Sequence, residues 1–165
     1  MTEESIRLEF DTLYRAEYAR VFRSAYLIVG NGEEARDLTQ EAFARAYANW
    51  SRVSSLTPPG PAAWLQRVAG NLSISWRRRQ RVRIRGYPVR DRTSYELEEV
   101  DPSLARALKR LSSAERAVIV LRYYADQSVD QVATALGKRP GTVRSLTARG
   151  VAKLRQVLQQ EEVRP

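Results

Sequence analysis

Residues 128–158 read SVDQVATALGKRPGTVRSLTARGVAKLRQVL, and they carry the clearest structural pattern in the chain. The first part has apolar residues at three- and four-residue steps, which predicts a short helix with one buried face. These residues are Val129, Val132, Ala133 and Leu136. Gly137 follows directly and predicts the end of this helix, because glycine readily adopts the left-handed conformation common at that position.

A second helix is predicted to begin three residues later, at Pro140-Gly141-Thr142. Its inner face is predicted to consist of Val143, Thr147, Gly150, Val151, Leu154 and Leu158. Small residues at Ala133 and Gly150 would let the two helices cross closely. Two helices joined by such a turn are typical of a DNA-binding helix-turn-helix, whose second helix enters the major groove.

Basic and hydroxyl side chains dominate the outward face of this second helix. Near its start the face carries Thr142, Arg144, Ser145, Ala148 and Arg149. Arginine reads guanine through two hydrogen bonds, and serine or threonine contacts bases or phosphates. Lys138, Arg139 and Lys153 are placed for contacts with backbone phosphates. An ordinary helical hairpin with a solvated basic face would share this pattern, so the residues alone leave both interpretations open.

The rest of the chain also follows helical periods. Helices are predicted at about 8–29, 33–50, 61 into an arginine run, 102–110, 113–125, 128–136 and 140–160. Two capping boxes mark helix starts, Ser112 with Glu115 and Ser128 with Gln131. Gly30-Asn31-Gly32 ends the first helix, and a proline-rich loop, 51–61, follows the second. No stretch alternates like a strand, so the predicted fold class is all-α.

Composition restricts the classes of function. The 165 residues contain no cysteine and no histidine, which removes thiolate chemistry, the commonest general base and the commonest metal ligands. We therefore expect no enzyme, cofactor, metal or small-molecule substrate. The start of the chain is acidic, unlike a signal peptide, and no apolar run is long enough to span a bilayer. A cytoplasmic protein without membrane contact is the expectation.

The net charge of +9 is concentrated in two blocks. Residues 61–92 carry nine arginines against one aspartate, and residues 138–165 carry seven basic against two acidic side chains. Two basic blocks separated by near-neutral sequence predict two contacts on one polyanion. The alternative interpretation of the two blocks is that their arginines only keep the protein surface solvated.

Between Gly86 and Asp101 the helical period fails, and mixed charges with a proline indicate a linker. We therefore predict two small helical domains, at residues 1–86 and 102–165, joined by a flexible linker at 87–101. The linker contains few apolar residues that could hold the two domains in one position relative to each other. Their relative position is therefore expected to vary or to depend on a partner.

An acidic stripe is predicted on the second helix. Asp37, Gln40 and Glu41 share one face at helical spacing, and the apolar residues around them point the other way. Carboxylates repel DNA, so the stripe indicates either a basic protein partner or a solvated face. The pattern alone does not choose between them.

Five motifs occur in a fixed order along the chain: DLTQEAF (37–43), WLQRVAGNL (64–72) followed by the arginine run, LSSAERAV (111–118), LRYY (121–124) and GTVRS (141–145). They belong to a wider resemblance, which covers roughly residues 8–158. In these motifs the chain resembles the extracytoplasmic-function (ECF) sigma factors of the sigma-70 class, and most of all their actinobacterial members.

The resemblance implies a subunit that carries core RNA polymerase to particular promoters and helps to open the −10 element of the promoter DNA. An anti-sigma factor is a further partner that it allows. The residues implied for core polymerase are Asp37, Gln40 and Glu41. Those implied for the −10 element are Asn71, Arg77, Arg78, Arg79 and Arg81, beside the loop 51–61. Those implied for the −35 element are Lys138, Arg139, Thr142, Arg144, Ser145 and Arg149.

Some residues depart from the family's usual pattern. The loop 51–61 is unusually rich in proline, which leaves its base preference open. Leu146 stands where a polar or basic residue is more common, so it either contacts a thymine methyl group or packs inward. Gly150 replaces the usual alanine, which is expected to weaken the recognition helix by about 1 kcal/mol at most.

Aromatic residues on apolar faces are usually core. Trp50 and Trp64 are therefore predicted to be buried, whereas Trp76 is left open between packing and base stacking. Tyr123 and Tyr124 are predicted to pack beneath the helix-turn-helix.

Two other functions compete with the sigma-factor interpretation. A conventional helix-turn-helix regulator with an N-terminal dimerisation or sensor domain would explain residues 128–158, but neither the first basic block nor the acidic stripe. A metal-dependent nuclease using Asp37 and Glu41 lacks a further acidic partner at clear ligand spacing.

Overall fold

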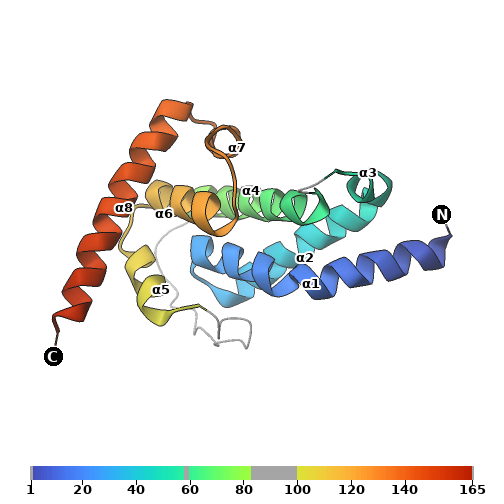
Figure 1. Ribbon diagram of the computed structural model, residues 1–165, viewed down its shortest axis with the longest axis horizontal. Helices are drawn as coiled ribbons and strands as arrows, with labels where there is room; N and C mark the ends of the chain where they lie inside the picture. Colours follow the sequence, from blue (N-terminus) through green and yellow to red (C-terminus); the bar gives the residue numbers. More distant parts are fainter. Residues whose placement is uncertain (1, 58–59, 83–99, 165) are drawn as a thin grey trace.

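The computed structural model describes residues 2–57, 60–82 and 100–164 (Figure 1). Every regular element in this part of the chain is a helix, as the all-α prediction requires. The helices are α1 (Glu3–Val29), α2 (Gly32–Ala48), α3 (Trp50–Ser54), α4 (Gly60–Val82), α5 (Pro102–Lys109), α6 (Ser113–Ile119), η2 (Val120–Tyr124), α7 (Val129–Leu136) and α8 (Pro140–Glu162).

The N-terminal half is a bundle in which α1, α2 and α4 pack on one another. The predicted break after the first helix is confirmed, because Gly30 takes a left-handed φ of 75° and its N–H bonds to the carbonyl oxygen of Tyr26. Asn31 then caps α2 by accepting from the backbone N–H of Glu34. The bundle core consists of Val21, Ala42, Phe43, Ala46, Leu65 and Ala69. Of the tryptophans, Trp50 is buried as predicted, and Trp64 and Trp76 are half-buried against the core.

The prediction of a loop at 51–61 is wrong for the first part of this segment, where the chain forms the short helix α3. Trp50 and Val53 lie three residues apart and are both buried, so one helical turn places both in the core. The prolines that indicated a loop begin only at position 58. Residues 58–59 lie outside the described residues.

Local capping signals also define the C-terminal half. Both predicted capping boxes are confirmed: Ser112 and Glu115 exchange hydrogen bonds at the start of α6, and Ser128 and Gln131 do so at the start of α7. The single helix predicted at 113–125 changes character at Val120, where η2 widens into a π-helical turn. This turn closes with a hydrogen bond of 2.9 Å from the N–H of Ala125 to the carbonyl oxygen of Val120.

The predicted helix-turn-helix consists of α7 and α8. Gly137 ends α7 with a φ of 62°, and Pro140 opens α8. Gly150 allows a close approach between helices, as predicted, but the helix that it approaches is α6 and not α7. A Cβ atom at this position would lie 2.9 Å from Cγ1 of Ile119, the last residue of α6.

Arg116 is a buried arginine that ties α6 to the end of α5. Its Nε donates to the carbonyl oxygen of Leu108 at 2.9 Å, and its Nη2 donates to that of Lys109 at 3.0 Å. These bonds add side-chain donors to the carbonyl groups at the end of α5, where the regular helical hydrogen bonds cease. Burial and the nearby charge of Arg77 lower the pKa of Arg116 to about 10, so it stays charged at neutral pH.

The two halves pack directly on each other, along a contact that we call the seam: α1 and α4 on one side, α6, η2 and α7 on the other (Figure 1). One cluster of buried apolar side chains spans it. At Gly70 of α4 a Cβ atom would lie 2.5 Å from Cδ2 of Leu121, so any larger residue would require the Leu121 side chain to move. The structure holds the two halves in one arrangement with direct apolar contact between them, and the expectation that this arrangement varies or depends on a partner stays a prediction. The predicted linker and the boundary at 86 fall mostly on 83–99, outside the described residues.

The seam also corrects the prediction for the tyrosine pair. Tyr124 does not pack beneath the helix-turn-helix. Its hydroxyl accepts a 2.6 Å hydrogen bond from Nε of Arg23 on α1. Tyr123 is 62% exposed.

Candidate nucleic-acid and protein interfaces

Helix α8 presents the outward face that its sequence predicts. Val143, Leu146 and Gly150 point into the protein and are buried. The side chains of the predicted outward residues are exposed: Thr142, Arg144, Ser145, Ala148 and Arg149. Leu146 is 7% exposed and packs inward, which removes the alternative of a thymine contact. The placement is thus confirmed, whereas the contacts of these residues with DNA stay a prediction.

The other basic residues of this region, two in the turn before α8 and one within α8, separate into two kinds. Lys138 and Arg139 are exposed in the turn before α8, where a DNA backbone would pass. Lys153 instead donates to both carboxylate oxygens of Glu115, at 2.9 and 3.0 Å. Glu115 is only 3% exposed and needs a cation there. Burial alone would raise the pKa of Glu115, but the hydrogen bonds from Lys153 and the Ser112 backbone together lower it. The phosphate contact expected of Lys153 therefore has no support.

The acidic stripe lies on the surface of α2 as predicted. Asp37, Gln40 and Glu41 are all exposed, while the apolar residues between them are buried. Nε2 of Gln40 donates to the Tyr14 hydroxyl at 3.2 Å, and Glu41 pairs with Arg45 at 2.8 Å. Exposed pairs of this kind contribute little to stability, so the stripe is available for a partner.

The arginine run of α4 is divided between the surface and the seam. Asn71 and Arg79 are exposed. Nη2 of Arg77 donates to Oγ of Ser113 at 2.6 Å, and Nη2 of Arg78 donates to the carbonyl oxygen of Leu136, also at 2.6 Å. The side chain of Arg81 lies outside the described residues. Two of the arginines predicted to contact DNA thus bond to the other half of the protein.

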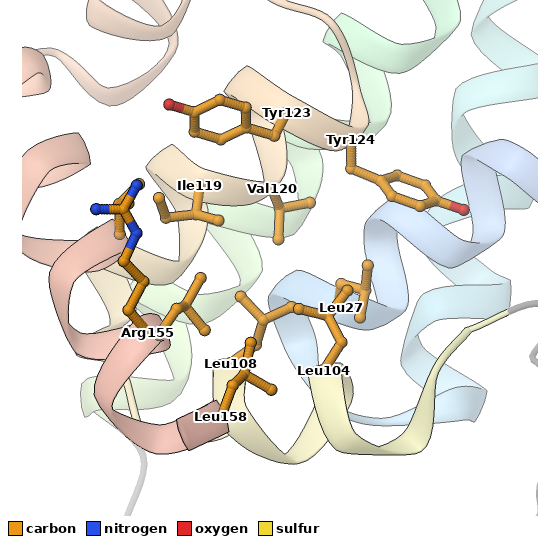
Figure 2. A pocket seen from close by; sticks show the side chains of 11 residues that line it. Leu27, Leu104, Leu108, Ile119, Val120, Tyr123, Tyr124, Arg155 and Leu158 are labelled. Carbon is orange, nitrogen blue, oxygen red and sulfur yellow. The ribbon is translucent and has the colours of Figure 1, made fainter. Parts of the chain in front are cut away.

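A largely apolar groove of about 490 Å³ was not predicted from the sequence (Figure 2). Leu104 and Leu108 of α5, Val120 and Tyr123, and Leu158 of α8 line it, with Leu27 of α1 closing one side and Arg155 extending beside it. The feature of the sequence that could have indicated this groove is the pair Leu154 and Leu158, which continues the apolar face of α8 beyond the helix-turn-helix. Exposed apolar grooves of this size often bind protein partners.

Neither a metal centre nor a membrane span is found among the residues described. In that part of the chain, no group of three or more Asp or Glu side chains is placed to bind a metal ion. Likewise, none of its helices is both long and apolar enough to cross a membrane.

Two family models match the chain on the elements that carry these surfaces. Sigma-70 region 2 matches residues 13–83, and Sigma-70 region 4 matches residues 107–156. The RNA polymerase sigma-E factor of Streptomyces coelicolor is 32% identical over 157 residues, which are 92% of this chain and 86% of that protein. The chain belongs to the ECF sigma factors of the sigma-70 family.

Other relatives of this sigma factor agree. The ECF RNA polymerase sigma factor SigL of Mycobacterium tuberculosis is 35% identical over 156 residues, 90% of this chain and 88% of that protein. The sigma factor RpoE of Bartonella quintana, solved in complex with the anti-sigma factor NepR, superposes with a TM-score of 0.65 at 22% identity. That likeness covers 92% of this chain and 97% of the other, and it supports the all-α fold of two helical domains. Region 2 contains the acidic stripe and the arginine run, and region 4 contains the outward face of α8.

Proposed function

We propose that this protein binds core RNA polymerase, directs it to specific promoters and helps to open the −10 element. The observation that carries the proposal is that one chain holds both regions in order, each with its predicted surface exposed. The protein assembles with polymerase and promoter DNA in the cytoplasm and has no enzymatic activity of its own.

Region 4 reads the −35 element through α8. Arg144, Ser145 and Arg149 approach base edges in the major groove, with Thr142 beside them. Lys138 and Arg139 contact phosphates and set the register of the helix. The exposure of all six side chains on one end of α8 supports this assignment.

Region 2 acts at the −10 element and on polymerase. Asn71 and the segment 51–61 contact an unpaired base, and Arg77, Arg78, Arg79 and Arg81 neutralise the neighbouring phosphates. Asp37, Gln40 and Glu41 dock on a basic surface of the polymerase clamp, where complementary charge sets orientation and association rate.

An anti-sigma factor is a further proposed partner. The apolar groove between α5, η2 and α8 supports it, because such a surface favours a protein ligand (Figure 2).

A conventional helix-turn-helix regulator is the alternative function. It would use α7 and α8 but would have no need of the acidic stripe or of the arginines of α4. The similarity to named sigma factors over about nine-tenths of the chain favours the polymerase subunit.

Gel filtration of the purified protein with core polymerase tests the proposal. The sigma factor should elute with the polymerase at stoichiometric ratio and should leave the position of the free protein. A regulator would elute separately while still shifting DNA, and this result would overturn the proposal.

A further inference from the structure

Glu115 is a buried carboxylate between α6 and α8, and it is 3% exposed. The backbone N–H of Ser112 donates to its Oε2 at 3.1 Å, and Nζ of Lys153 donates to its two oxygens at 2.9 and 3.0 Å. A carboxylate that is covered by protein is costly unless its charge is balanced and its oxygens accept hydrogen bonds. Lys153 supplies the balancing charge, so its ammonium group is held at α6.

This ion pair lies beside a close approach between α6 and α8. Gly150 precedes Lys153 by three residues, which places both on one face of α8. A Cβ atom at Gly150 would lie 2.9 Å from Cγ1 of Ile119 and 3.7 Å from Cβ of Glu115. Helix α8 therefore meets α6 at two successive levels, through a steric contact and an ion pair. The two contacts together hold α8 at one angle to α6.

The angle of α8 matters because base readout is sensitive to small displacements. Three residues proposed to read bases precede Lys153 on the same helix by four, eight and nine positions: Arg149, Ser145 and Arg144. At about 1.5 Å per residue, Arg144 is about 14 Å from Lys153 along the axis. A tilt of ~10° at the ion pair would move it by roughly 2 Å, which is enough to break a hydrogen bond to a base edge.

We propose that Lys153 is a positioning residue, which acts through Glu115 to set the direction in which α8 presents its base-reading side chains, and that it makes no phosphate contact. This inference rests on the proposed function, which assigns the −35 element to α8. The side chain of Lys153 is 51% exposed, so its exposure fits either role. The two bonds to Glu115 are the observation that favours positioning.

The two roles predict different results for Glu115→Gln. Glutamine keeps an oxygen for the Ser112 N–H, as capping boxes commonly do, but it removes the charge that holds Lys153. A positioning lysine would lose its anchor, so affinity for the −35 element should fall. A lysine that contacts phosphate would be released towards the DNA, so affinity should stay equal or rise.

Fluorescence anisotropy of the full-length protein measures affinity for a −35 duplex and for a scrambled duplex over a range of salt concentrations. The −35 duplex carries the sequence shared by promoters that the protein transcribes with core polymerase. We expect Glu115→Gln and Lys153→Met each to lower the ratio of the two affinities about tenfold, the contribution of one base contact, with an unchanged salt slope. Lys153→Arg should retain the ratio, because a guanidinium also pairs with a carboxylate.

Two comparisons separate positioning from its alternatives. Lys138→Met, in the exposed turn before α8, is the matched control for a phosphate contact. It should weaken binding to both duplexes equally and reduce the salt slope by about 0.9. In the Glu115→Gln background, Lys153→Met should have little further effect, because the pair is already lost. Partial unfolding would lower both affinities by the same factor, so the ratio does not report stability.

An unchanged ratio in Glu115→Gln would overturn the proposal. So would a salt slope in Lys153→Met that falls as far as it does in Lys138→Met, or an equal loss from Lys153→Met with and without Glu115→Gln. If the wild type yields no transcripts with core polymerase, the proposed function has failed instead.

Discussion

At the scale of single residues, two glycines set how closely helices approach. Gly70 meets Leu121 across the seam, and Gly150 meets Ile119 within region 4. Neither glycine is required by a left-handed backbone, so the requirement is steric. Substitutions at these positions therefore test packing and not turn conformation.

Gly150→Ala should destabilise the protein, although alanine is the better helix former by about 1 kcal/mol. The added Cβ would lie 2.9 Å from Cγ1 of Ile119, and overpacking of this kind costs about 1–3 kcal/mol. Urea unfolding measures the net change. In an Ile119→Ala background, which lacks the contacting Cγ1 atom, adding Gly150→Ala should cost less. An increase in stability for the single variant would show that the helices separate at little cost.

Gly70→Leu should force the seam apart, because its side chain would overlap the buried Leu121. We expect a larger radius of gyration by small-angle X-ray scattering and retained helix content by circular dichroism. Ala16→Leu, at an exposed position of α1, is the matched control. An unchanged radius in Gly70→Leu would mean that the seam does not determine the arrangement of the halves in solution.

At the scale of elements, the sequence predicts most helix boundaries to within a few residues. The residues that begin or end these helices bond to residues nearby in the chain, so a short stretch of sequence is enough to predict them. They are Gly30, Ser112, Ser128 and Gly137. The seam has no such signal, because Gly70 and Leu121 are brought together only by the fold. For the same reason the sequence does not predict the hydrogen bonds of Arg77 and Arg78 to the other half, and it misses the groove of Figure 2.

The recognition face of α8 should read bases. Arg144→Ala should lower affinity for the −35 element by about 1–3 kcal/mol and relax specificity at one base pair. Lys138→Ala, in the turn, should weaken binding to all sequences about equally and reduce its salt dependence. Competition with single-base variants of the duplex distinguishes the two. An equal loss on every sequence for Arg144→Ala would make it a phosphate contact.

The arginine run of α4 should supply sequence-independent affinity at the −10 element. Replacing Arg77, Arg78 and Arg79 together with glutamine should reduce the slope of log K against log salt by about 0.7–0.9 for each phosphate that is no longer neutralised. The measurement uses holoenzyme on a promoter fragment, because in the structure of the free protein two of these side chains bond across the seam. A slope equal to that of the wild type would place the run away from DNA.

At the scale of the whole molecule, the proposed function requires the acidic stripe and the two proposed DNA surfaces to act in one assembly. Asp37→Arg with Glu41→Arg should abolish the complex with core polymerase through like-charge repulsion. The thermal melt should change little, since both side chains are exposed. Binding to −35 duplex should also persist, which separates docking from DNA recognition. A normal melt together with an intact polymerase complex would show that the stripe is not the docking surface.

Run-off transcription with core polymerase on a genomic fragment library tests the central claim most directly, because it requires polymerase binding, promoter recognition and strand opening together. We predict discrete transcripts from a small set of fragments that share −10 and −35 sequences, and no transcripts from core polymerase alone. Transcription that is no different with and without the protein would contradict the sigma-factor function.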